Sequence, residues 1–190
     1  MRKTAPLLAL LLAALTATGC SALERDYPPG DPGAMRGRLT DRAQWAYDGM
    51  ALPPHPPVSP STVSPRHHCP AGGLSLDETA QDVVSYELRW TVEDVPDRVA
   101  GATEARLRKR FVSQGWTVTH EDNRRTATTV LYGFRVEDPR TGDTFDLAWN
   151  SGTTSLFLTG YTPCAKVPPG TAGAASQEPW SPRTGRLPTG

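Results

Sequence analysis

The sequence predicts a two-layer α+β domain, a mostly antiparallel sheet of about five strands with one helix on one face. Segments of alternating apolar and polar residues recur between positions 84 and 159, and this is the period of a half-buried strand. One apolar stripe of helical period interrupts them. Proline is rare here, with only four of the 19 prolines between positions 67 and 166. We therefore expect residues 67–166 to form a single domain.

Two clear periods define the first strand and the helix. The apolar members of the strand are Val84, Tyr86, Leu88, Trp90 and Val92. The segment Asp94-Val95-Pro96-Asp97 is then expected to open a helix, with the proline near its first turn, because proline and acidic residues both suit a helix start. Its apolar stripe repeats every four residues and consists of Val99, Thr103, Leu107 and Phe111. Gly115 follows as a typical C-terminal residue of a helix.

Four more strands complete the expected order β-α-β-β-β-β. They cover residues 116–120, 130–136, 145–149 and 156–159. A loop at 139–142 joins the two middle strands and sets the register of their hairpin. The expected pairs are Val136 with Phe145, Phe134 with Leu147, Tyr132 with Trp149 and, on the other face, Arg135 with Asp146. The helix then covers the apolar face, and the other face contacts water. In the 116–120 strand, Trp116, Val118 and His120 are expected to share one face.

The first twenty residues have the pattern of an export signal. Arg2 and Lys3 precede an apolar run at positions 7–15. This run is shorter than the roughly 20 residues of a membrane span but fits the core of a signal peptide. Small residues then lead to Cys20. The segment resembles the lipobox of bacterial lipoproteins, although that pattern prefers leucine where Ala17 stands. An ordinary secretory signal with an incidental Cys20 is the alternative.

The chain thus resembles the small envelope lipoproteins of GC-rich bacteria. The resemblance implies that residues 1–19 are a signal peptide and that the Cys20 thiol carries a diacylglyceryl group. Two acyl chains, palmitate among them, give a stable anchor where one chain gives a marginal one. We therefore expect the mature chain on the extracytoplasmic side of the cell membrane, held there by its lipid. No second apolar run is long enough for a spanning helix.

Proline-rich arms are expected on both sides of the domain. Residues 20–66 hold nine prolines and residues 167–190 hold five, so these segments are predicted to be a disordered tether and a disordered tail. A flexible tether of this length would span roughly 40 Å and hold the domain away from the membrane. Within it, residues 40–49 are compatible with one or two helical turns, either transient or docked on a partner or the domain.

Two cysteines remain after Cys20. Cys69 and Cys164 lie at the two edges of the proline-poor region, and outside the cytosol such a pair is expected to form a disulfide. In the loop-entropy model a bridge across about 95 residues stabilises the fold by roughly 4 to 5 kcal/mol. A metal site at His67, His68 and Cys69 is the alternative. Adjacent residues rarely converge on one metal and no second cluster completes four ligands, so no metal site is predicted.

Candidate catalytic chemistry is thin. Acidic and basic residues number 20 each, so no net charge attracts nucleic acid. No phosphate loop, dinucleotide fingerprint or G-x-S-x-G elbow is present, and no cofactor is expected. His120 is the only histidine in the strand region. Carboxylate pairs occur at Asp94 and Asp97, Glu121 and Asp122, and Asp143 and Asp146, each with a structural explanation. No residue is predicted to be catalytic.

The outward side of the helix is basic. It carries Arg98, Arg106, Lys109 and Arg110. Glu104 is the only acidic residue expected to offset these charges, and it lies four residues before Arg108. This side is a candidate face for anionic lipid headgroups, an anionic wall polymer or an acidic envelope protein. A solvated helix face with extended side chains is the alternative.

These observations predict a non-enzymatic binding or accessory module in the cell envelope. Three surfaces are candidates for binding: the basic helix face, the uncovered sheet face, and the aromatic segment around Trp45 and Tyr47. An envelope hydrolase with an unrecognised site and a structural spacer are the alternatives.

Overall fold

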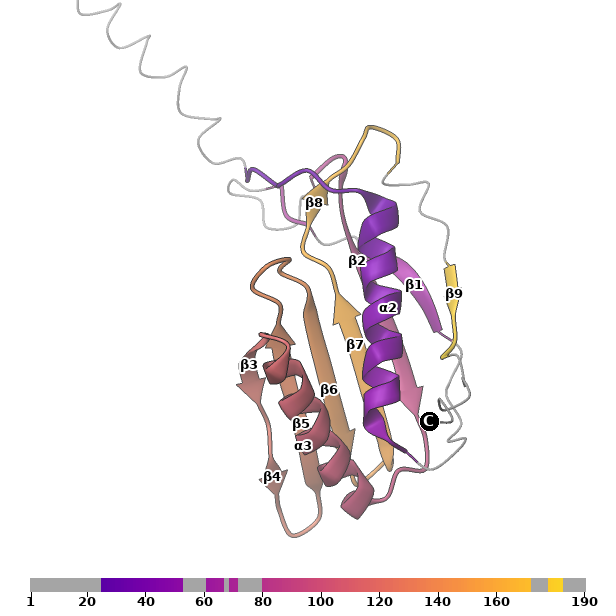
Figure 1. The fold of residues 1–190 in the computed structure, drawn as a ribbon, viewed down its shortest axis with the longest axis vertical. Coiled ribbons are helices and arrows are strands. Elements are labelled where there is room, and N and C mark those ends of the chain that lie inside the picture. The colour runs from indigo at the N-terminus through magenta and orange to yellow at the C-terminus, as the bar shows by residue number, and fades with distance from the viewer. Residues whose placement is uncertain (1–24, 53–60, 67–68, 72–79, 172–177, 183–190) are drawn as a thin grey trace, which may run out of the picture.

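Two helices cover one face of a single, mostly antiparallel sheet (Figure 1). The computed structural model describes residues 25–52, 61–66, 69–71, 80–171 and 178–182. Within these residues the sheet has nine strands in the order β3-β5-β6-β7-β2-β1-β9, with β4 paired to β5 and β8 paired to β2. The α+β class is confirmed. The predicted count of about five strands and one helix is wrong, because one helix and two strands form in the segments expected to be arms, and two short strands more form between residues 67 and 166.

The elements have the following bounds in chain order: α2, Pro32–Met50; β1, Ser61–Arg66; β2, Val83–Val92; α3, Asp97–Ser113; β3, Thr117–Glu121; β4, Arg124–Arg125; β5, Val130–Glu137; β6, Thr144–Asn150; β7, Ser155–Tyr161; β8, Ala165–Lys166; β9, Glu178–Trp180.

The elements expected between residues 84 and 159 form where their periods place them. β2, α3, β3, β5, β6 and β7 correspond to the predicted order β-α-β-β-β-β. The β5–β6 hairpin has the predicted register, with Phe134 opposite Leu147 and Arg135 opposite Asp146. Its loop closes through the Asp138 N–H, which donates to the Asp143 carbonyl at 2.9 Å. Apolar pairs on one face and opposite charges on the other select this register.

Helix α2 corrects the prediction of a disordered tether over residues 20–66. It begins at Asp31, whose side chain accepts a hydrogen bond from the Ala34 N–H at 2.6 Å, followed by proline at the first helical position. The short helical stretch expected at residues 40–49 lies inside this helix, which is nineteen residues long. Its buried stripe recurs at helical spacing and consists of Met35, Leu39, Ala43, Ala46 and Met50. Most of these side chains are small or flexible, so the stripe is weak in the sequence although the helix lies on the sheet.

Two edge elements correct the arms further. β1 pairs with β2 on one side and with β9 on the other, so part of the expected C-terminal tail belongs to the sheet. β9 pairs only with Ser61–Val63 of β1, so β1 is the edge strand of the sheet at Pro65. Proline is tolerated at an edge because its missing N–H leaves no partner strand without a hydrogen bond. Trp180 of β9 packs edge-on against Trp90 with ring centroids 5.0 Å apart, so the contact with a large aromatic side chain fixes this short strand.

The core lies between the two helices and the sheet. α2 contacts β7, β2 and β1, while α3 contacts β3 and β5 and also packs against α2. On its other face the sheet exposes Arg135 of β5 and Ala148 of β6, as the β5–β6 charge pairing predicts. Gly160 of β7 faces α2, and a Cβ at this position would stand 3.2 Å from Leu39 Cδ2. The absence of a side chain there lets α2 approach the sheet closely.

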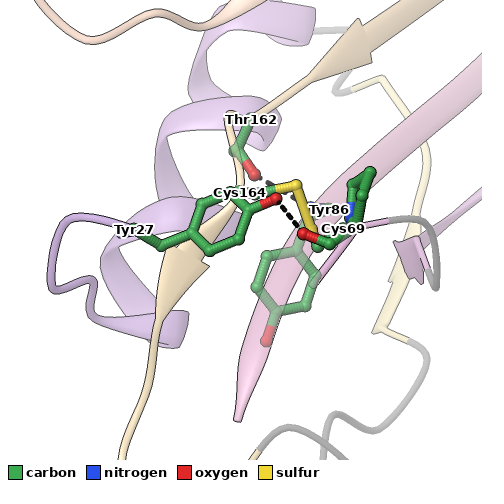
Figure 2. The surroundings of a disulfide bond; sticks show 6 residues. Tyr27, Cys69, Tyr86, Thr162 and Cys164 are labelled. Carbon is green, nitrogen blue, oxygen red and sulfur yellow. Dashed lines mark hydrogen bonds between the residues drawn. A yellow bond between two sulfur atoms is a disulfide. The ribbon is translucent and has the colours of Figure 1, made fainter. Parts of the chain in front are cut away.

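The predicted disulfide joins Cys69 to Cys164 (Figure 2). The two residues are 95 apart in sequence and their Cα atoms are 5.8 Å apart, within the range that a disulfide spans. Tyr27 lies beside the bridge in Figure 2, and its hydroxyl donates to the Pro70 carbonyl at 2.7 Å. The bridge therefore links the segment before β2 to the segment after β7, at the end of the domain where the described chain begins.

Several expectations fall outside the described residues. They include the signal peptide at 1–19, the lipidation site Cys20, and His67 and His68 of the alternative metal site. Among the residues that the structure describes, no helix is both long enough and apolar enough to cross a membrane.

Replacing Leu39 with alanine tests whether α2 belongs to the core. The side chain is 3% exposed, so Leu39→Ala should lower the free energy of unfolding by about 2–5 kcal/mol. Asp41→Ala, at an exposed position of the same helix, is the matched control and should change it by less than about 0.5 kcal/mol. Urea unfolding of both variants makes the comparison. Equal, small effects would mean that α2 is a detachable linker helix.

Candidate functional site

The uncovered face of the sheet has a hollow above β5 and β6. It has a volume of about 420 Å³ and is lined by residues of β3, β5, β6 and the β3–β4 connection. The lining residues that point away from the helices are His120, Leu131, Gly133, Arg135, Asp146, Ala148 and Asn150. A concave surface with an apolar base and polar groups around it is the usual form of a binding site.

Small residues make the base of this hollow. Gly133 pairs with Ala148, and Ala148 pairs with Phe157 in the next strand. A Cβ at Gly133 would stand 2.9 Å from the Leu147 carbonyl oxygen, so a side chain there would force the two strands apart. Glycine at this position therefore serves close strand pairing and also lowers the surface of the sheet.

Charged pairs border the hollow. The Arg135 guanidinium donates two hydrogen bonds to Asp146, at 2.6 and 2.7 Å, and these raise the pKa of Arg135. Arg124 makes the same two-point contact with Asp122, another lining residue, at 2.5 and 2.6 Å, and lowers the pKa of that carboxyl. In both pairs the carboxylate holds its arginine as a hydrogen-bond donor with fixed orientation.

A β-bulge brings His120 to this face. The pairing of β3 with β5 shifts between Val118 and His120, so that Val118 lies opposite Val136 while His120 lies opposite Arg135. The extra residue, Thr119, changes the face of every residue after it. The expectation that His120 shares a face with Trp116 and Val118 is therefore wrong. The bulge leaves no signal in an alternating sequence, and it alone adds His120 to the hollow.

The predicted basic face divides into two parts. Arg106 donates to the Met50 carbonyl at the end of α2, and the Arg110 guanidinium lies 4.2 Å from the centroid of the Trp45 ring. These two side chains join α3 to α2. Arg98 and Lys109 are exposed, so only they remain as free members of the candidate face for an anionic partner. Arg108 pairs with Glu121 and not with Glu104 as expected.

The aromatic segment of α2 is part of the helix packing. Trp45 packs edge-on against Phe111 of α3 with centroids 5.0 Å apart, and Tyr47 lies 5.8 Å from Trp90 of β2. These rings therefore hold α2 on the domain, which leaves little of them to dock an outside partner. The sequence shows the aromatics but not the elements that they contact.

Glu104 is a buried carboxylate in α3. The residue is 6% exposed and its Oε1 atom has no hydrogen-bond partner among the described residues. Burial raises the pKa of Glu104, Glu121 adds to this rise, and Arg108 opposes it. Glu104 does not line the hollow above β5 and β6, so its position bears on stability.

Five of the six paired carboxylates have structural partners. Asp97 accepts a hydrogen bond from the Tyr132 hydroxyl at 2.7 Å, and Asp143 accepts two from Arg38, at 2.8 and 3.1 Å. Glu121, Asp122 and Asp146 each pair with an arginine. Among the described residues no three His, Cys, Asp or Glu side chains gather as a metal site would require.

Comparison with protein-family models, with curated proteins and with solved structures finds no match. The surfaces described above are therefore the basis for inferring a function.

Arg110 and Lys109 provide a test of the divided basic face. Arg110→Gln removes the cation–π contact with Trp45 and should lower the free energy of unfolding by about 0.5–2 kcal/mol. Lys109→Gln removes the same charge from an exposed position and should change it by less than about 0.5 kcal/mol. Urea unfolding distinguishes the two. Equal effects would contradict a packing role for Arg110.

Glu104 predicts a pH-dependent stability. The pKa of Glu104 is raised in the folded state. Its contribution to the free energy of unfolding is therefore fully present below the pKa of the unfolded chain, about 4.3, and is lost as pH rises through the pKa of the folded protein. Glu104→Gln should therefore raise the melting temperature at pH 7 and leave it nearly unchanged at pH 4. Glu137→Gln, at an exposed position, is the control. Thermal unfolding across pH 4–8 checks this, and a lower melting temperature at pH 7 would contradict it.

Proposed function

We propose that this chain is an exported lipoprotein, anchored through Cys20 on the extracytoplasmic side of the cell membrane. There it acts as a non-enzymatic binding module, and its binding surface is the open face of the sheet around the β5–β6 hollow. The single observation that carries the choice of surface is that both helices lie on one face of the sheet and leave the other uncovered.

Export is supported by the cysteines together with the N-terminal pattern. Cys69 and Cys164 are close enough to form a bridge, and disulfides persist in compartments outside the cytosol. The run of apolar residues at 7–15 before Cys20 supplies the signal for that route. Neither observation depends on the other, and both favour the same side of the membrane.

The contacts of the other two candidate surfaces support the same choice. Trp45 and Tyr47 are engaged with α3 and β2, and Arg106 and Arg110 are engaged with α2. The hollow has small apolar residues at its base and oriented donors and acceptors around it. It suits an envelope partner that presents an apolar group next to hydrogen-bonding groups.

Site-specific photo-crosslinking tests the proposal. A photoreactive amino acid replaces Ala148 in the full chain, and the matched probe replaces Ala105, an exposed residue of α3. Adducts are collected from intact cells and identified by mass spectrometry. We expect a discrete adduct from position 148 that is absent at position 105 and disappears when Leu131→Trp fills the hollow.

The other outcomes separate the alternatives. An adduct at position 105 alone would favour the basic helix face, and no adduct at either position would favour a structural spacer. A chain recovered from the cytosol with its signal peptide intact would overturn the export part of the proposal.

A further inference from the structure

The first described residues are hydrogen-bonded to both of the chain segments that the disulfide joins. On one side the Arg25 N–H donates to the Ala71 carbonyl at 3.2 Å, and the Tyr27 hydroxyl donates to Pro70. On the other side the Gly30 N–H donates to the Lys166 carbonyl, and the Lys166 N–H donates to the Pro28 carbonyl, both at 2.8 Å. Residues 25–30, called the N-terminal segment below, are thus held between residues 69–71 and β8. The Cys69–Cys164 bridge links these two neighbours of the segment (Figure 2).

The fit of this segment against β8 leaves no spare room. A Cβ at Gly30 would stand 2.5 Å from the Ala165 Cβ and 3.1 Å from the Met35 sulfur. Real Cβ atoms do not approach so closely, so glycine is required for the segment to lie against β8. Pro29 and Lys166 also form a parallel β-bridge next to this contact. The segment is therefore part of the domain and not the start of a flexible arm.

This attachment shortens the tether that the sequence predicts. The expected arm runs from Cys20 to residue 66, whereas the domain already begins at Arg25. Five residues of fully extended chain reach at most about 18 Å. A lipid on Cys20 therefore cannot stand farther than this from the N-terminal segment, whatever path residues 21–24 take.

We infer that the end of the domain formed by residues 25–30, 69–71 and 165–166 rests at the lipid headgroup surface. The inference rests on the lipid anchor of the proposed function. The partner of this end is the bilayer itself, brought within reach by the short tether. β2 starts at this end, where Val83 pairs with Lys166, and it ends at Val92 opposite Leu156. Its ten residues span about 33 Å, so the β6–β7 turn stands at the far end.

Energy transfer to a labelled membrane measures this arrangement. The full lipidated chain is placed in vesicles of phosphatidylcholine and phosphatidylglycerol that contain a headgroup-linked acceptor dye. A fluorescent amino acid replaces either Gln81, at the near end of β2, or Thr153, in the β6–β7 turn; both positions are exposed. We expect stronger transfer from position 81 than from position 153. A Gly/Ser insertion of about 20 residues after position 24, which adds roughly 25 Å of reach, should weaken transfer from both.

Two glycine variants test the attachment itself. Gly30→Ala should detach the N-terminal segment from β8, whereas Gly37→Ala, at a helix position with no atom within 4 Å of the added Cβ, should not. Trypsin cleavage after Arg25, followed by mass spectrometry, should then release the domain from vesicles several-fold faster for Gly30→Ala than for Gly37→Ala.

The results overturn the two proposals separately. Equal transfer from positions 81 and 153, or no response to the insertion, would overturn the placement at the membrane. Equal cleavage of the two glycine variants would overturn the attachment of the segment. Mass spectrometry of Cys20 reports the lipid directly. A chain without lipid would refute the anchor, while the cleavage comparison on that same chain still tests the attachment.

Discussion

The ring of Phe111 is where the two helices and the sheet meet. It is fully buried and lies 5.0 Å from Trp45 of α2, 5.0 Å from Trp116 before β3, and 5.3 Å from Phe145 of β6, measured between ring centroids. Edge-on and tilted aromatic contacts of this kind add to the free energy of burial. Because one ring contacts both helices and the sheet, α2 and α3 are held on the same face, and the opposite face stays open.

The arginines of the two helices complete this arrangement. The central guanidinium carbons of Arg42 and Arg110 lie 5.2 and 4.2 Å from the centroid of the Trp45 ring. Arg42 also lies 4.8 Å from the centroid of Trp116. Arginine side chains that lie over aromatic faces bury much of their aliphatic part, while the charged group at the end remains hydrated. A basic surface that the sequence suggests as a docking face for an anionic partner is therefore partly the interface between the two helices. The hollow above β5 and β6 remains unoccupied by such packing.

The elements that could be predicted are those in which apolar residues recur with a clear local period. β2 and the β5–β6 hairpin have strict alternation of apolar and polar residues, and α3 has an apolar stripe with an acidic start. The positions of these elements and the register of the hairpin therefore follow from the residues alone. α2 could have been found from Asp31, the proline after it and the spacing of Met35, Leu39 and Met50, but proline-rich neighbours and small apolar residues hid it. β1 and β9 are too short to show a period, since Trp180 is held by Trp90 from another part of the chain. The candidate site was predictable only as an open sheet face, because the bulge at Thr119 that adds His120 depends on pairing with β5.

The sequence by itself determined the class of fold, the pairing of the central hairpin and the choice of Cys69 and Cys164 as disulfide partners. Each of these depends on residue types at short spacing or on the small number of cysteines. Only the tertiary structure decided where the domain begins, which basic side chains stay free and which residues line the hollow. These depend on contacts between segments far apart in the chain, such as Gly30 against Ala165, and no local pattern specifies which distant surface a side chain meets.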